Sequence, residues 1–120
     1  IKDNHIDYAG GIENAIQRTR NYLSSTGRNL KVEIEARNLD DVYKIIATGG
    51  VDRIMLDNFS VSDTREAVGI ISGRFETESS GGITLGTVSA YAECGVDFIS
   101  VWALTHHIKS LDMSLKAILD

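Results

Sequence analysis

The chain has 120 residues, the size of a single domain, and its 42% hydrophobic and 24% charged residues are typical of a soluble globular protein. The net charge of −5 argues against a general nucleic-acid-binding protein, because neutralising phosphates requires clustered lysine and arginine. No apolar run approaches the ~20 residues that cross a bilayer, so we expect no membrane partner. The single cysteine, Cys94, favours a reducing cytoplasm and a buried packing role for its side chain.

Short β-rich runs alternate with amphipathic segments along the whole chain. We expect strands at residues 30–36, 53–56, 74–79 and 97–101. Apolar residues at helical spacing predict helices within 12–23, 39–46, 61–71 and 85–92. The expected N-caps are Asn38, Ser60 or Ser62, and Thr84, and the glycines expected after helix ends are Gly49-Gly50, Gly73 and Gly95. This order predicts an α/β fold of parallel βα units.

Side chains alternate between two faces along each predicted strand. In the first strand Val32 and Ile34 share one face, and Glu33 and Glu35 share the other. The same alternation groups Met55 with Asp57, and Glu76 with Glu78 and Ser80. Because crossover helices cover the outer face of a parallel sheet, we expect the carboxylates to point inward. An open, solvent-facing sheet is the alternative explanation.

Polar residues at the predicted strand ends recur at nearly even intervals. Glu35, Asp57, Ser80 and Trp102 are separated by 22, 23 and 22 positions. An even period indicates successive units around one axis, each placing one residue at the rim where βα barrels build their sites. A whole barrel takes ~250 residues, so we expect these units to form part of a TIM-like (β/α) barrel, about half of one. The opening Ile1-Lys2 is typical of a strand end inside a longer chain.

A glycine turn and two acids at the rim are candidates for chemistry. Ser80-Gly81-Gly82 precedes a predicted helix, so its backbone N–H groups and the helix N-terminus are expected to bind a phosphate; an ordinary glycine turn is the alternative. Glu35 and Asp57 suit ribose hydroxyls or Mg²⁺ held jointly with substrate phosphates, although either could instead pair with a lysine.

Lys2 and His106 are the remaining candidates. Lys2 suits either a substrate carboxylate or, with a lowered pKa, a Schiff base. Nearby inward carboxylates would keep such a lysine charged, which favours anion binding. Of the adjacent His106 and His107, at most one projects into a site from a regular helix, and His106 is nearer the strand end. Capping or exposure to solvent is the alternative role for that histidine.

Several short motifs together resemble the quinolinate phosphoribosyltransferase family over nearly the whole chain. They are Lys2-Asp3-Asn4-His5, Val32-Glu33-Ile34-Glu35, Met55-Leu56-Asp57-Asn58, Glu78-Ser79-Ser80-Gly81-Gly82-Ile83, Gly95-Val96-Asp97, Ala103-Leu104-Thr105-His106 and Leu111-Asp112-Met113-Ser114-Leu115. The resemblance implies a pentosyltransferase that moves a phosphoribosyl group from phosphoribosyl pyrophosphate to quinolinate with decarboxylation. The product is nicotinate mononucleotide, in NAD biosynthesis.

The resemblance also implies a role for each matching residue. Lys2 would bind a quinolinate carboxylate, and Glu35 and Asp57 would contact the ribose and its Mg²⁺. Ser80, Gly81 and Gly82 would hold the 5′-phosphate, helped by the turn at Trp102 and Ala103, with His106 nearby. The family has glycine where this chain has Trp102, and an indole there would obstruct close approach of the backbone to phosphate.

The family's quinolinate-binding arginines lie before the position of Lys2, and some come from the second subunit of a dimer. We therefore expect residues 1–120 to be the C-terminal part of the barrel domain, without the N-terminal domain and the first barrel strands. The expected assembly is a homodimer or higher oligomer. The alternatives are a non-catalytic barrel fragment that folds by self-association and a Schiff-base lyase that uses Lys2.

Overall fold

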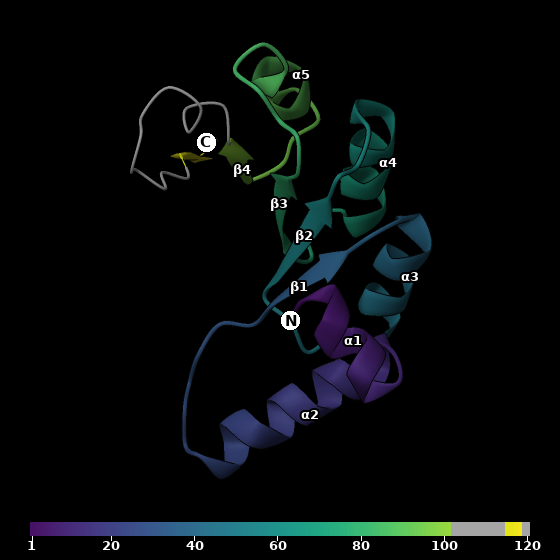
Figure 1. The fold of residues 1–120 in the computed structure, drawn as a ribbon, viewed down its shortest axis with the longest axis vertical. Coiled ribbons are helices and arrows are strands. Elements are labelled where there is room, and N and C mark those ends of the chain that lie inside the picture. The colour runs from purple at the N-terminus through teal and green to yellow at the C-terminus, as the bar shows by residue number, and fades with distance from the viewer. Residues whose placement is uncertain (102–114, 119–120) are drawn as a thin grey trace.

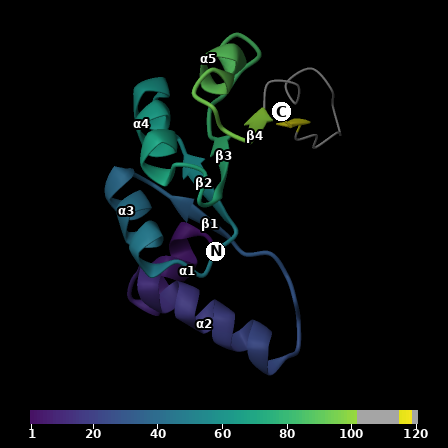
Figure 2. The same ribbon diagram turned by 180° about the vertical axis from the view of Figure 1, so that it is seen from behind.

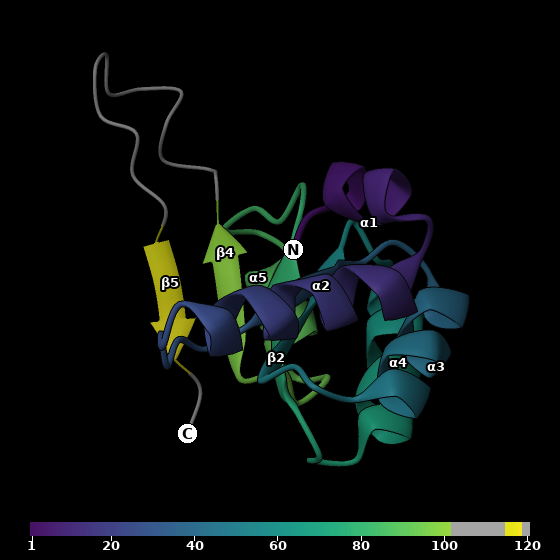
Figure 3. The same ribbon diagram turned by 90° about the horizontal axis from the view of Figure 1, so that it is seen from below.

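A computed structural model describes residues 1–101 and 115–118 of the chain. Its elements, in chain order, are α1 (Asp3–Ala9), α2 (Ile12–Ser25), β1 (Glu33–Ala36), α3 (Leu39–Thr48), β2 (Arg53–Asp57), α4 (Val61–Ile71), β3 (Glu76–Ser80), α5 (Val88–Ala92), β4 (Phe98–Val101) and β5 (Leu115–Ile118). The strands form one sheet in the order β1-β2-β3-β4-β5 (Figure 1). The first four are parallel, and β5 runs antiparallel to β4 (Figure 3).

The βα alternation confirms the predicted α/β class. Helices α3 and α4 lie along one side of the parallel strands, as the views from the front and from behind show (Figures 1 and 2). Two of the expected N-caps are confirmed: the side chain of Asn38 accepts a hydrogen bond from the Asp41 N–H, and that of Ser60, not Ser62, accepts one from the Asp63 N–H. Helix α1 and strand β5 were not predicted, because neither has a long enough apolar pattern of its own.

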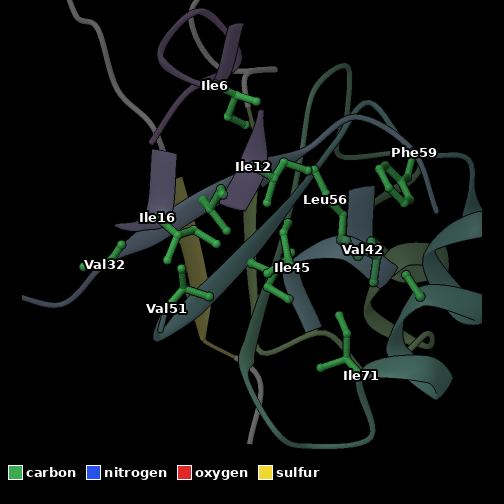
Figure 4. Close-up of a cluster of buried hydrophobic side chains, with 14 of the residues drawn as sticks. Ile6, Ile12, Ile16, Val32, Val42, Ile45, Val51, Leu56, Phe59 and Ile71 are labelled. Carbon is green, nitrogen blue, oxygen red and sulfur yellow. The ribbon is translucent and has the colours of Figure 1, made fainter. Parts of the chain in front are cut away.

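The hydrophobic core fills the space between the helix-covered face of the sheet and the helices. Ile34, Ile54 and Leu56 are fully buried there, in one cluster with Val42 and Ile45 of α3. Figure 4 shows Leu56, Val42 and Ile45 in this cluster. Burying each such side chain contributes about 1.5–3 kcal/mol relative to leaving it exposed. Their alternation with partly exposed residues confirms that the apolar set faces the helices and the carboxylates face the other way.

A repeated Gly-Val-Asp sequence locks the amino ends of two strand pairs. The Asp52 carboxylate accepts a hydrogen bond from the Val32 N–H at 2.6 Å, and the Asp97 carboxylate accepts one from the Thr77 N–H at 2.8 Å. In return, the Asp52 and Asp97 N–H groups donate to the carbonyls of Val32 and Thr77. This contact explains why β1 begins at residue 33 and not at the predicted residue 30: the amide of Val32 bonds to a side chain before the ladder starts.

The first residue extends the sheet beyond β1. The Ile1 nitrogen donates to the Glu33 carbonyl, and the Ile1 carbonyl accepts from the Glu35 N–H, the hydrogen-bond pattern of a neighbouring parallel strand. Lys2 follows at once, in the N-cap position before α1, so it lies where a strand would end, as predicted. Among the described residues, no helix is both long and apolar enough to cross a membrane.

Candidate functional site

The carboxyl ends of β2 and β3 place two predicted site residues side by side. Asp57 and Ser80 are register partners in the parallel ladder, and both are half-buried. Adjacent strands lie ~4.8 Å apart, so the carboxylate and the hydroxyl are within reach of one small ligand. Within residues 1–101 and 115–118, no hydrogen bond or ion pair engages the Asp57 carboxylate, which leaves it available to a ligand.

Glu35 lies deeper along the strands than the even spacing suggested. Its register partner is Met55, two residues before Asp57. The spacing therefore identified the correct face of the sheet and the wrong level, because neighbouring strands of a closing barrel are staggered. The Glu35 carboxylate accepts a hydrogen bond from the Asp3 N–H at 3.2 Å, which holds it against the segment that carries Lys2. The side chain of Lys2 is exposed at this end of the sheet.

The Ser80-Gly81-Gly82 turn depends on glycine for a steric reason. Gly81 has φ +91, and a Cβ built on it would lie 2.9 Å from the Asn58 nitrogen. The Asn58 N–H also donates a 2.8 Å hydrogen bond to the Ser80 carbonyl, so the two backbones are in direct contact. Gly82 has φ +67 and is exposed, which leaves its backbone accessible to an anion.

The helix after this turn differs from the prediction. Thr84 is not its N-cap: residues 84–87 form a turn closed by the Thr87 N–H to Thr84 carbonyl hydrogen bond, and α5 begins only at Val88. A helix dipole acts within about one turn of its end, so α5 contributes little to an anion at Gly82. Any phosphate binding at the turn must rest on the Ser80 hydroxyl and the backbone N–H groups.

A charged cluster that the sequence analysis overlooked lies on the same inner face, below the rim. Arg53 stacks on the ring of Phe98, 3.7 Å from its centroid, and forms an ion pair with Glu76 at 3.3 Å. The fully buried Glu78 accepts a 2.7 Å hydrogen bond from the Ser100 hydroxyl and lies 3.9 Å from the Arg53 guanidinium. Alternation alone would have placed Arg53 here, because it shares the face of Met55 and Asp57.

Comparisons with known proteins show which family the chain belongs to. Residues 1–116 match the model of the quinolinate phosphoribosyl transferase C-terminal domain. The nicotinate-nucleotide pyrophosphorylase (carboxylating) of Arabidopsis thaliana is 45% identical over 97% of this chain, and a probable enzyme of the same name from Bacillus subtilis is 37% identical over 96%. The chain belongs to the quinolinate phosphoribosyltransferase family. Its α/β units are thus part of the family's TIM-like barrel, as predicted.

Solved structures of this family match the fold directly. The nicotinate-nucleotide pyrophosphorylase of Francisella tularensis superposes with a TM-score of 0.79 and 46% sequence identity, covering 91% of this chain. The shared part is 37% of that structure's chain, and this chain likewise spans 37% of the Arabidopsis relative. The fold and the family are therefore established for a segment that is well under half the length of its relatives.

The family resemblance also assigned roles to Trp102, Ala103 and His106, and these three residues lie outside the described part of the chain. Their predicted contribution to phosphate binding stays a prediction. The six other predicted residues fall into two places: Asp57 is next to Ser80 and the two glycines, whereas Glu35 contacts Asp3, the neighbour of Lys2, near β1.

A cavity of about 490 Å³ between α1, α2 and α3 is separate from these residues. Its polar lining is internally paired: the Arg37 guanidinium contacts the carboxylates of Asp41 at 3.3 Å and Asp7 at 3.5 Å. The hydrogen bond to Asp41 raises the pKa of Arg37 above its usual value. We interpret this group as an ion-pair network that joins α1 to α3.

Proposed function

We propose that this chain is the ribose-phosphate half of a quinolinate phosphoribosyltransferase active site. The observation that carries the proposal is the pairing of Asp57 with Ser80, followed at once by Gly81-Gly82, at the carboxyl ends of adjacent parallel strands. That edge is where βα barrels place their catalytic groups. The names of the relatives, carboxylating nicotinate-nucleotide pyrophosphorylases, support the assignment.

The proposed reaction joins the ring nitrogen of quinolinate to C1′ of phosphoribosyl pyrophosphate. Pyrophosphate leaves C1′ with the bonding electron pair, and positive charge develops on the ribosyl centre. The carboxylate next to the nitrogen is then lost as carbon dioxide, and the ring carbon takes up a proton to give nicotinate mononucleotide. Negative groups near the ribosyl centre stabilise the developing charge, which is the role we propose for Asp57 and Glu35.

The 5′-phosphate is proposed to bind at the Ser80-Gly81-Gly82 turn. The Ser80 hydroxyl and the exposed Gly82 backbone can donate hydrogen bonds to phosphate oxygens, and the positive φ values of both glycines hold the backbone in a concave turn. Because Asp57 adjoins Ser80, a ribose whose phosphate occupies the turn would present its hydroxyls to the Asp57 carboxylate.

Mg²⁺ fits this site as a partner of the substrate. Mg²⁺ is usually bound by one or two carboxylates together with substrate phosphates and waters. The half-buried Asp57 carboxylate, which has no hydrogen-bond partner among the described residues, provides one such ligand, and Glu35 is the other proposed one. When bound, the ion would neutralise the leaving pyrophosphate.

Lys2 is proposed to bind a quinolinate carboxylate. Its exposed side chain lies at the rim, on a segment tied to Glu35 through the Asp3 N–H. A Schiff-base lysine is normally activated by removal from water, and an exposed side chain does not meet that condition. The surroundings of Lys2 therefore favour charge pairing over the lyase alternative.

A chimeric enzyme tests the proposal. The matching C-terminal segment of the Bacillus subtilis relative, 38% of its length, would be replaced by this chain. The chimera and the chain alone would receive phosphoribosyl pyrophosphate, quinolinate and Mg²⁺, with nicotinate mononucleotide measured as product. We expect turnover by the chimera and a ~10²–10³-fold lower rate by its Asp57→Asn variant. A folded chimera without turnover would contradict the proposal, and trapping of a substrate on Lys2 by borohydride would support the lyase instead.

The alternative of a non-catalytic fragment has one structural observation in its favour. Among the described residues, Ile1 alone pairs with the outer edge of β1, and exposed strand edges promote association with another chain. We propose that the chain associates as a homodimer or higher oligomer, which analytical ultracentrifugation would measure. We propose a cytoplasmic location because the one cysteine is buried and free, although the name of the Arabidopsis relative places that protein in the chloroplast.

A further inference from the structure

We infer that residues 58–61, here called the brace, position the phosphate-binding turn. Asn58 of the brace, and Tyr91 of α5, which contacts the brace, are the positioning residues. The inference rests on the proposed function, because it assumes that the Ser80-Gly81-Gly82 turn binds the 5′-phosphate. The brace connects β2 to α4 and begins immediately after Asp57.

The brace contacts the start of the turn through its backbone. Asn58 donates its N–H to the Ser80 carbonyl at 2.8 Å, and it does so with φ +58, a left-handed conformation. Most residues adopt that conformation at a cost, whereas asparagine and glycine tolerate it. The close approach of Asn58 to Gly81 depends on the same conformation, so the identity of residue 58 determines how near the two backbones lie.

The brace also contacts the far end of the segment that follows the turn. The Tyr91 hydroxyl, from α5, donates a 2.7 Å hydrogen bond to the carbonyl of Phe59, which is 6% exposed. The Cys94 thiol points at the Val61 carbonyl, 3.4 Å away. Residues 80–94 are therefore tied to the brace at both ends.

Between these ties the segment has little support of its own. Residues 84–87 are exposed, and Ile83 is the one fully buried side chain of residues 81–90. An exposed loop with few apolar contacts moves readily unless its ends are fixed. Since the brace follows Asp57 directly, it fixes the distance between the ribose-hydroxyl end and the phosphate end of the proposed site.

Tyr91→Phe tests this inference with a matched control. The variant deletes one hydroxyl and keeps the ring, and Tyr43→Phe deletes the hydroxyl of a tyrosine that is 54% exposed on α3. We expect Tyr91→Phe to raise the Kd for ribose 5-phosphate about fivefold, the usual effect of one lost hydrogen bond, and Tyr43→Phe to leave it unchanged. In the chimera, the KM for phosphoribosyl pyrophosphate should rise and the KM for quinolinate should not.

Asn58 variants separate conformation from side-chain chemistry. Asn58→Gly keeps access to the left-handed conformation, so we expect a Kd within about twofold of the parent protein. Asn58→Val disfavours it, and we expect a Kd raised about tenfold or more. An equal loss in both variants would overturn the positioning role, because it would show that the amide side chain itself binds the ligand.

Amide hydrogen exchange of the chain reports on the brace without any ligand. We expect faster exchange at Asn58 and across residues 81–84 in Tyr91→Phe and Asn58→Val, measured well below the melting temperature of each variant. Unchanged exchange in both variants would overturn the inference. Exchange could increase as expected while the parent protein binds no ribose 5-phosphate. That result would support the positioning of the turn by the brace and would contradict the proposed function.

Discussion

Asp97 and Asp57 lie at opposite ends of parallel strands in the same sheet, and their carboxylates have opposite surroundings. The Asp97 carboxylate accepts hydrogen bonds from the Thr77 N–H at 2.8 Å and the Thr77 hydroxyl at 3.1 Å. The Asp57 carboxylate accepts none within the described residues. Asp52 repeats the arrangement of Asp97 on the preceding strand pair.

This difference indicates that the carboxylates at the amino ends of the strands serve stability, and that Asp57 at a carboxyl end serves ligand binding. A carboxylate that accepts hydrogen bonds from backbone N–H groups at the start of a strand stabilises the fold. A half-buried carboxylate without such partners adds little to stability and keeps its lone pairs for a substrate or a cation. Barrel folds in general divide their two faces in this way. Substitutions at the two ends should therefore affect different measurements.

The largest effect is expected for Asp57→Asn. Removing one electrostatic group of an active site typically lowers the rate ~10²–10³-fold, and we expect a loss of that size in kcat/KM of the chimera. The free energy of unfolding should change by less than about 0.5 kcal/mol, because no described contact is lost. Asp63→Asn, an exposed acid in the first turn of α4, is the control and should retain activity. A large loss of stability in Asp57→Asn would contradict the claim that the carboxyl ends of the strands contribute to function and not to stability.

Asp97→Ala should produce the reverse pattern. The variant leaves the buried Thr77 N–H and hydroxyl without their acceptor, which costs about 2–3 kcal/mol of folding free energy. Asp52→Ala loses the acceptor of a single N–H, so we expect a smaller cost of about 1–2 kcal/mol. Urea unfolding of the chimera would measure both, and kcat of the folded variants should be unchanged. Equal destabilisation by the two substitutions would contradict the explanation that the cost depends on how many hydrogen bonds each carboxylate accepts.

Gly81→Ala should cause an intermediate loss at the functional end. The new methyl group would lie 2.9 Å from the Asn58 nitrogen in a backbone with positive φ, a strain of about 1–3 kcal/mol. Gly82→Ala also has positive φ, but its methyl group meets nothing closer than 3.9 Å, and its strain should be about 1 kcal/mol. Titration with ribose 5-phosphate would rank the two variants. Tighter binding by Gly81→Ala than by Gly82→Ala would show that contact with Asn58 is unimportant.

The smallest effect concerns Cys94, which precedes β4 at the stable end. Burial raises the pKa of the Cys94 thiol, so less of the reactive thiolate forms at a given pH than in an exposed cysteine. We expect slow alkylation by iodoacetamide at pH 8 in the folded chain and rapid alkylation in urea. Rapid alkylation of the folded chain would show that this end opens more easily than its hydrogen bonds indicate.

Local patterns predicted the features that depend on neighbouring residues. Alternation placed Glu35, Asp57 and Ser80 on the inner face, and the polar residue before an apolar helical run identified Asn38 as a cap. Each of these features follows from a few consecutive residues. The burial of Cys94 was also correctly predicted from its apolar surroundings.

Features that depend on distant contacts were not predictable in this way. Glu35 pairs with Met55 because the strands are staggered, and the spacing of residues along the chain gives no information on that stagger. The hydrogen bond between Tyr91 and Phe59 joins residues 32 positions apart, and no local pattern marks either of them as partners. The prediction of Thr84 as an N-cap was wrong because its carbonyl closes a turn before α5. The presence of a threonine does not by itself distinguish the N-cap of a helix from the first residue of a turn.

The two Gly-Val-Asp clamps act on the outer strand pairs of the parallel sheet. Asp52 fastens β1 to β2, and Asp97 fastens β3 to β4. The central β2–β3 ladder has five register pairs and ends where Asp57 meets Ser80. A ligand that spans these two residues would bridge the carboxyl ends of β2 and β3, so substrate occupancy should protect this end of the ladder from local opening.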